Sequence, residues 1–139
     1  MPRRRPEPIW LSRVVVDAVH HDQIREHGGL AGIRDENALE SALARPQQKW
    51  NYGHRWDIPM LAAAYAFGLV KGHPYRDGNK RIGFLAMVTF LGLNDYDFDA
   101  TDADVIAEVL GLADGSVSEE TFAEWIREHC SAPPGASKK

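Results

Sequence analysis

Residues 73–81 have the sequence HPYRDGNKR and lie between two apolar segments, residues 58–70 and 82–93. The stretch joins a histidine, a carboxylate, a glycine, an amide and three cations. A loop that ends at a helix N-terminus points unpaired backbone N–H groups into one concavity, and the helix dipole adds positive potential there. The sequence therefore predicts a phosphate site between two core-forming helices.

The side chains of this stretch suit nucleotide chemistry. His73 is a candidate general base for a hydroxyl nucleophile. Asp77 lies beside the cations and is a candidate oxygen ligand for Mg²⁺ that bridges phosphates. Cations in the first turn of a helix oppose its dipole, so Lys80 and Arg81 indicate an anion between them. The candidate phosphate-binding residues are Gly78, Asn79, Lys80 and Arg81.

The flanking apolar segments predict two packed helices at the centre of the fold. Pro59 suits the first turn of a helix that runs to about Val70. Alanines at positions 62, 63, 64 and 66 indicate that this helix is closely packed. The second central helix is expected from about Gly78 to Leu93.

Two helices are expected before this pair. The first should begin after Ser12 as its N-cap and end at Gly28. The next should begin after Asp35 and be closed by Pro46. Residues 47–57 contain aromatic and amide side chains without a helical period, and predict a loop or short hairpin.

Two more helices are expected after the pair. Residues 94–100 predict a loop or short extended piece, and Thr101 or Asp102 can cap a helix that ends at Gly115. Ser118 can cap the last helix, whose buried face would include Trp125. No run of alternating strands is present, so the predicted fold class is all-α, a compact single-domain bundle of about six helices.

Composition limits the class of protein. The chain has 139 residues, of which 44% are hydrophobic and 26% charged, as in ordinary globular domains. Its net charge of −4 argues against direct nucleic-acid binding over a broad surface. Cys130 is the single cysteine, which fits a reducing cytoplasm. No signal region or run of about 18 apolar residues exists, so we expect a cytoplasmic protein without a membrane span.

The domain boundaries follow from the ends of the chain. Residues 1–8 and 131–139 are rich in proline, arginine, lysine and glycine, and are predicted to be flexible tails. The folded domain is therefore expected to span residues 9–130.

Residues 73–81 resemble the motif of the Fic/Doc superfamily, His-Pro-aromatic-x-Asp/Glu-Gly-Asn-Gly/Lys-Arg. The similarity extends to the death-on-curing (Doc) toxin branch, and covers about residues 9–129. It is carried by residues 28–35, by LESALARPQ at 39–47, by FLGLN at 90–94, and by Trp125.

Two positions distinguish activities within the superfamily. Lys80 stands where adenylyl-transferring Fic enzymes usually have glycine, and Phe84 stands where they usually have a second arginine. Doc toxins have the lysine, and the resemblance implies transfer of the γ-phosphoryl group of ATP to a Ser or Thr hydroxyl of elongation factor Tu. Gly78 departs from the Doc toxin, which has alanine there, so adenylyl transfer stays open as the alternative.

The resemblance also implies roles for individual residues. His73 would take the proton from the target hydroxyl, Asp77 would hold Mg²⁺, and the residues from Gly78 to Arg81 would hold the phosphates of ATP. Residues 47–57 would occupy the place of the family's flap, which aligns the target segment. The candidate docking residues in this flap are Gln48, Asn51 and Tyr52.

The sequence also bears on how the protein is regulated and on other functions that it could have. No inhibitory Ser/Thr-x-x-x-Glu-Gly/Asn pattern is present, so an active protein of this kind would be restrained in trans by a small antitoxin. A retained module that binds nucleotide or antitoxin without catalysis is the second alternative. The histidines of the first helix, His20, His21 and His27, are attributed to exposed helix polarity rather than to a metal site.

Overall fold

The computed structural model describes residues 6–53 and 55–132. The element order is α1 (Arg13–His27), α2 (Glu36–Tyr52), α3 (Ile58–Gly72), α4 (Asn79–Leu93), β1 (Asp97–Phe98), α5 (Asp102–Asp114), α6 (Glu119–His129) and β2 (Cys130–Ser131). The two short strands pair antiparallel, with Asp97 opposite Ser131. The all-α prediction with six helices is confirmed, and the extended piece expected within residues 94–100 is strand β1.

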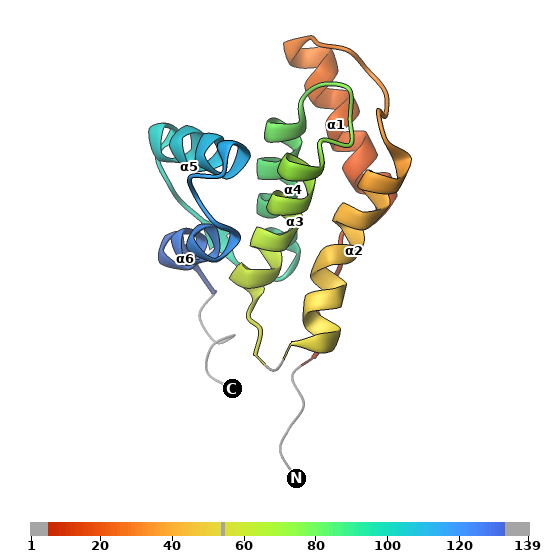
Figure 1. Ribbon diagram of the computed structural model, residues 1–139. Coiled ribbons are helices and arrows are strands. Elements are labelled where there is room, and N and C mark those ends of the chain that lie inside the picture. The colour runs from red at the N-terminus through yellow and green to blue at the C-terminus, as the bar shows by residue number, and fades with distance from the viewer. Residues whose placement is uncertain (1–5, 54, 133–139) are drawn as a thin grey trace.

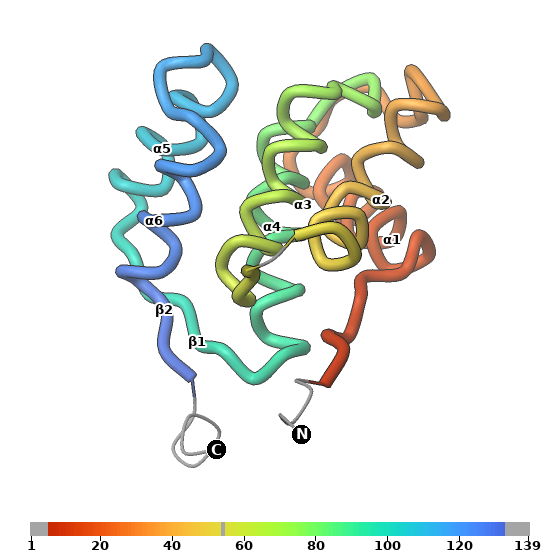
Figure 2. Tube along the Cα trace, turned by 60° about the horizontal axis from the view of Figure 1, so that its bottom comes forward, coloured from red at the N-terminus to blue at the C-terminus, as the bar shows by residue number. Residues whose placement is uncertain are grey.

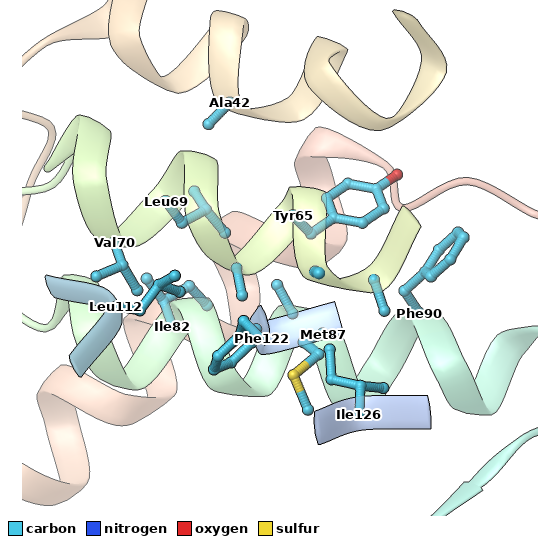
Figure 3. Close-up of a cluster of buried hydrophobic side chains, with 14 of the residues drawn as sticks. Ala42, Tyr65, Leu69, Val70, Ile82, Met87, Phe90, Leu112, Phe122 and Ile126 are labelled. Carbon is cyan, nitrogen blue, oxygen red and sulfur yellow. The ribbon is translucent and has the colours of Figure 1, made fainter. Parts of the chain in front are cut away.

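The helix α3 forms the centre of the molecule. Figures 1 and 2 show α1 and α2 on one side of the α3–α4 pair, and α5 and α6 on the other. The aromatic ring of Tyr65 and the side chain of Leu69 are fully buried, and the neighbouring helices supply Phe90, Phe122 and Ile126 to the same core (Figure 3). Burial of such side chains is the main favourable term in folding.

Small residues allow α2 and α3 to approach closely. A Cβ atom built on Gly68 would lie 2.9 Å from the Cα of Ala42 on α2. Gly72 lies beside Ala38, one helical turn further along both helices. The two helices are therefore antiparallel, and the C-terminal end of α2 lies near the N-terminal end of α3.

We expect Gly68→Ala to lower the free energy of unfolding. Overpacking against a helix backbone costs about 1–3 kcal/mol, which exceeds the gain of up to about 1 kcal/mol from replacing glycine in a helix. Gly92→Ala in α4 is the matched control, because nothing lies within 4 Å of a Cβ at that position. Urea denaturation should show Gly92→Ala at or above wild-type stability, and equal stability of the two variants would contradict the close contact.

The predicted end of the second helix was wrong. Pro46 lies inside α2, which continues to Tyr52 and ends with the N–H of Gly53 bonded to the carbonyl of Lys49. Proline costs a helix one hydrogen bond, but tertiary contacts hold the turns that follow. Trp50 meets Trp10 edge to face with ring centroids 5.9 Å apart, and Lys49 lies 3.5 Å from Glu119 of α6.

The structure of the chain extends slightly past both boundaries that were predicted for the folded domain. Pro8 is buried, and the backbone N–H of Ile9 donates to the side chain of Asn94. Ser131 belongs to β2, one residue past the predicted boundary at 130. Residues 1–5 and 133–139 of the predicted tails lie outside the described residues.

Candidate active site

The connection between α3 and α4 places the HPYRDGNKR stretch at one end of the central helix pair (Figure 1). His73 ends α3 in the left-handed conformation, with φ 52° and ψ 51°. Gly78 precedes α4, also left-handed, at φ 79°. A left-handed histidine costs about 1–2 kcal/mol, and strain of this kind concentrates at functional sites. The backbone thus turns sharply twice within six residues and presents the N-terminus of α4.

The predicted site residues of this stretch line one pocket. Its volume is about 680 Å³, within the usual range of small-molecule and cofactor pockets. The polar side of the pocket is formed by His73, Asp77, Gly78, Asn79, Lys80 and Arg81. The opposite wall is apolar and comes mainly from α5, through Val105, Ile106, Val109 and Leu110.

Lys80 and Arg81 are the electrostatic feature of this pocket. Both side chains are exposed, and neither forms a hydrogen bond or ion pair with another residue in the described part of the chain. Two unpaired cations in the first turn of α4 oppose its dipole. An anion bound there would remove the repulsion and use the free N–H groups of the helix at the same time.

Asp77 also lines this pocket. Its Oδ2 accepts a hydrogen bond from the backbone N–H of Leu30, in the connection between α1 and α2. Among the described residues no cluster of three or more His, Cys, Asp or Glu side chains could hold a metal ion alone. A single carboxylate fits Mg²⁺, which is commonly bound by one or two carboxylates together with substrate phosphates and water.

Asn79 lines the pocket but is largely buried, and its side-chain amide contacts the loop and His73. Its Oδ1 accepts from the N–H of Tyr75, and its Nδ2 donates to the carbonyl of Tyr75, both at 2.9 Å. The same Nδ2 lies 2.9 Å from Nδ1 of His73. The amide predicted to bind phosphate therefore connects the loop backbone to the imidazole.

The segment beside the motif is the α1–α2 connection, residues 28–35. Ile33 and Tyr75 form an antiparallel bridge, and the N–H of Arg34 donates to the carbonyl of Pro74 at 2.7 Å. The Arg34 guanidinium donates to the carbonyls of His73 and Gly72. A cation at the C-terminus of α3 is favoured by the helix dipole and satisfies its last carbonyls.

The predicted flap location was therefore wrong. Gln48 and Asn51 lie in the last turns of α2, and Tyr52 ends that helix with 83% of its surface exposed. Gln48 and Tyr52 line a shallow pocket with Met60 at the start of α3, and Asn51 lies in the same turn of α2, whereas the motif follows the end of α3. A helix of this length spans about 22 Å, so the three side chains do not adjoin His73. Pro46 does not break α2, which carries them away from the site.

Two residues of α1, His20 and Asp17, contact the motif. His20 is 4% exposed, its Nε2 lies 2.8 Å from the carbonyl of Asp77, and its ring stacks on Tyr75 at 3.7 Å. Asp17 accepts from the hydroxyl of Tyr75 at 2.6 Å and from Arg13 at 2.9 Å. The prediction of exposed helix polarity was wrong for His20. Asp17 and His20 lie three residues apart on one face of the helix, and this spacing was the signal in the sequence that could have indicated that they act together.

We expect Tyr75→Phe to lower the free energy of unfolding by about 1.5–3 kcal/mol, the value of a hydrogen bond to a charged group. Burial, together with the neighbouring Asp17 carboxylate, raises the pKa of Tyr75 above its ordinary range. The folded protein therefore holds this proton more tightly than the unfolded chain. The advantage of wild type over Tyr75→Phe should be full below about pH 10 and decline above it. Urea denaturation at pH 8 and pH 10.5 measures this, and a constant difference would contradict it.

Phe84 occupies the position that distinguishes adenylyl-transferring relatives. Its ring lines the pocket and meets Phe98 of β1 edge to face, with centroids 6.0 Å apart. The pocket thus has an aromatic wall at the position where such enzymes usually have a second arginine.

Comparison with known proteins agrees with this geometry. The family model described as Fic/DOC family matches residues 10–91, more than half of the chain. A relative from Escherichia phage P1, named protein kinase doc, is 30% identical over 112 residues, which is 79% of this chain and 86% of the relative. A relative from Mycolicibacterium smegmatis, named toxin Doc, is 37% identical over 92 residues, 59% of this chain and 68% of the relative. The chain belongs to the Doc branch of the Fic/Doc family.

Proposed function

We propose that this protein is the toxin of a type II toxin–antitoxin system and that it phosphorylates a Ser or Thr hydroxyl of a translation protein, elongation factor Tu, and so blocks translation. The observation that carries the proposal is the pocket that His73 and Asp77 line together with Lys80 and Arg81, two cations in the first turn of α4 that have no partner among the described residues. The names of the two relatives, a protein kinase and a toxin, support the same activity. The choice of elongation factor Tu rests on the resemblance to Doc toxins.

The residues of the pocket suit each part of phosphoryl transfer from ATP. As His73 accepts the proton of the target hydroxyl, the oxygen forms a bond to the γ-phosphorus and the bond from that phosphorus to ADP breaks. Lys80 and Arg81 stabilise the charge that gathers on the transferred group and on ADP. Asp77 would hold Mg²⁺, which when bound neutralises further phosphate charge.

Phosphoryl transfer is favoured over adenylyl transfer by Lys80 and Phe84. The lysine adds a cation in the first turn of α4, and the aromatic ring packs on Phe98 in place of a second phosphate-binding arginine. Gly78 is the residue that argues against this choice, because its left-handed conformation at φ 79° is easier for glycine than for the alanine of the Doc toxin.

An antitoxin is proposed as the partner that restrains the protein. Ile106 and Leu110 of α5 are 59% and 49% exposed on the apolar wall of the pocket. An amphipathic helix that folds on binding buries side chains of this kind in an apolar groove. Such a partner would cover the pocket and exclude ATP or the target. No described helix is long and apolar enough to cross a bilayer.

The test uses ATP labelled at either the α- or the γ-phosphate. The protein is incubated with Mg²⁺ and purified elongation factor Tu, and in parallel with a cell extract, beside a His73→Ala control. We expect γ-label on the factor and none with the control. Label from the α-phosphate would instead support adenylyl transfer. Bound nucleotide without transfer of either label would support a non-catalytic binding module.

A further inference from the structure

The side-chain amide of Asn79 has only one possible orientation. Its two atoms face the backbone of Tyr75, where the N–H can only donate and the carbonyl can only accept. The atom 2.9 Å from the Tyr75 N–H must therefore be the amide oxygen, and the atom 2.9 Å from the Tyr75 carbonyl must be Nδ2. Asn79 is only 5% exposed, so water does not compete for these positions.

This orientation decides which nitrogen of His73 carries the proton. Nδ2 of Asn79 has two hydrogens, and one of them is donated to the Tyr75 carbonyl. The other points to Nδ1 of His73, 2.9 Å away. Nδ1 must accept this hydrogen bond through its lone pair, and a neutral imidazole then carries its hydrogen on Nε2.

We infer that Asn79 is a positioning residue that holds neutral His73 in the Nε2–H tautomer, so that the free protein presents a hydrogen-bond donor to the pocket instead of a base. His73 can accept a substrate proton at Nε2 only after its own hydrogen has moved to Nδ1, which requires the Asn79–Nδ1 hydrogen bond to break. The consequence for catalysis rests on the proposed function. The tautomer rests only on the contacts of Asn79.

Two other histidines provide internal standards for a measurement. Nδ1 of His129 lies 2.8 Å from the carbonyl of Trp125, which can only accept, so this ring must carry its hydrogen on Nδ1. Nε2 of His20 lies 2.8 Å from the carbonyl of Asp77, so this ring must carry its hydrogen on Nε2. One spectrum therefore contains a reference for each tautomer.

The test is a long-range ¹H–¹⁵N correlation spectrum of the full chain labelled with ¹⁵N-histidine, at about pH 9, where histidines are ordinarily neutral. Signals are assigned by comparison with variants of single histidines, including His73→Gln. We expect His73 to match His20 and to be opposite to His129. A hydrogen on Nδ1, or an equal mixture of tautomers, would overturn the inference.

Asn79→Asp tests the cause. The carboxylate still accepts from the Tyr75 N–H but cannot donate to Nδ1, so His73 should change to the Nδ1–H form while His20 and His129 stay unchanged. An unchanged His73 would show that Asn79 does not set the tautomer. If the variant does not fold, a ¹⁵N–¹⁵N coupling across the hydrogen bond between Asn79 and His73 in labelled wild type decides instead, and its absence would assign the tautomer to another cause.

Addition of Mg²⁺ and a non-hydrolysable ATP analogue separates this inference from the proposed function. A change of His73 to the Nδ1–H form with the analogue bound supports both. If His73 keeps its hydrogen on Nε2 in the complex, it cannot serve as the base, and the proposed role of His73 fails while the tautomer of the free protein stands.

Discussion

His73→Gly is expected to lower phosphoryl transfer by about 10²–10⁴-fold, the usual contribution of a general base, without lowering the free energy of unfolding. Glycine adopts the left-handed conformation of this position without the steric cost that histidine bears. This gain offsets the lost hydrogen bond to Asn79. The pair of measurements is γ-label transfer to elongation factor Tu and urea denaturation of the free protein.

His21→Ala is the matched control for this prediction. His21 lies on α1, is exposed, and forms no hydrogen bond or ion pair with the described residues. Its replacement should change neither rate nor stability. If His73→Gly kept the wild-type rate, the imidazole would not be the base. If it unfolded the protein, the role of His73 would be structural.

Asp77→Asn is expected to lower Mg²⁺-dependent transfer by about 100-fold or more. A metal ion supplies several kcal/mol of charge stabilisation, and each 1.36 kcal/mol is about tenfold in rate. The amide oxygen of asparagine can still accept the hydrogen bond from the N–H of Leu30. The variant therefore removes the charge and keeps the link to residues 28–35. Titration of the transfer rate with MgCl₂ should show a raised requirement for the metal.

Asp77→Ala separates the two roles of this carboxylate. It removes the metal ligand and also the acceptor for Leu30, so hydrogen exchange of the Leu30 amide should accelerate in Asp77→Ala and remain slow in Asp77→Asn. Equal Mg²⁺ dependence of wild type and Asp77→Asn would exclude Asp77 as a metal ligand.

Helix starts could be predicted because their signals are local. Ser12, Asp35, Thr101 and Ser118 each accept a hydrogen bond from a backbone N–H three residues later. A cap of this kind depends only on one side chain and the next turn of backbone. The end of α2 could not be predicted in the same way, because Pro46 is a local signal for termination that contacts with Trp10 and Glu119 override.

The candidate site likewise has a part that local sequence signals predict and a part that they do not. The side chains from His73 to Arg81 are contiguous, and the polar ones among them that were predicted as site residues do line one pocket. Their supports, Asp17, His20 and Arg34, contact the motif from 39 to 58 positions away in the sequence. Single-residue signals in α1 could not indicate that its polar face meets the motif. From the resemblance to the family we expected a flap beside the motif and placed it at residues 47–57. In the structure, residues 28–35 lie against the motif instead.

Six helices, the position of the motif at the N-terminus of α4 and two cations in the first turn of that helix could all be predicted from the amino-acid sequence. These properties follow from hydrophobic periodicity, caps and charge within one or two helical turns. Three features became visible only in the folded protein: the segment that flanks the motif, the contact of Asn79 with His73, and the apolar side chains of α5 that line the pocket. These depend on side chains distant in sequence that meet when α3 packs against α2, α4, α5 and α6. Burial then leaves each buried polar group only the partners that the fold places beside it.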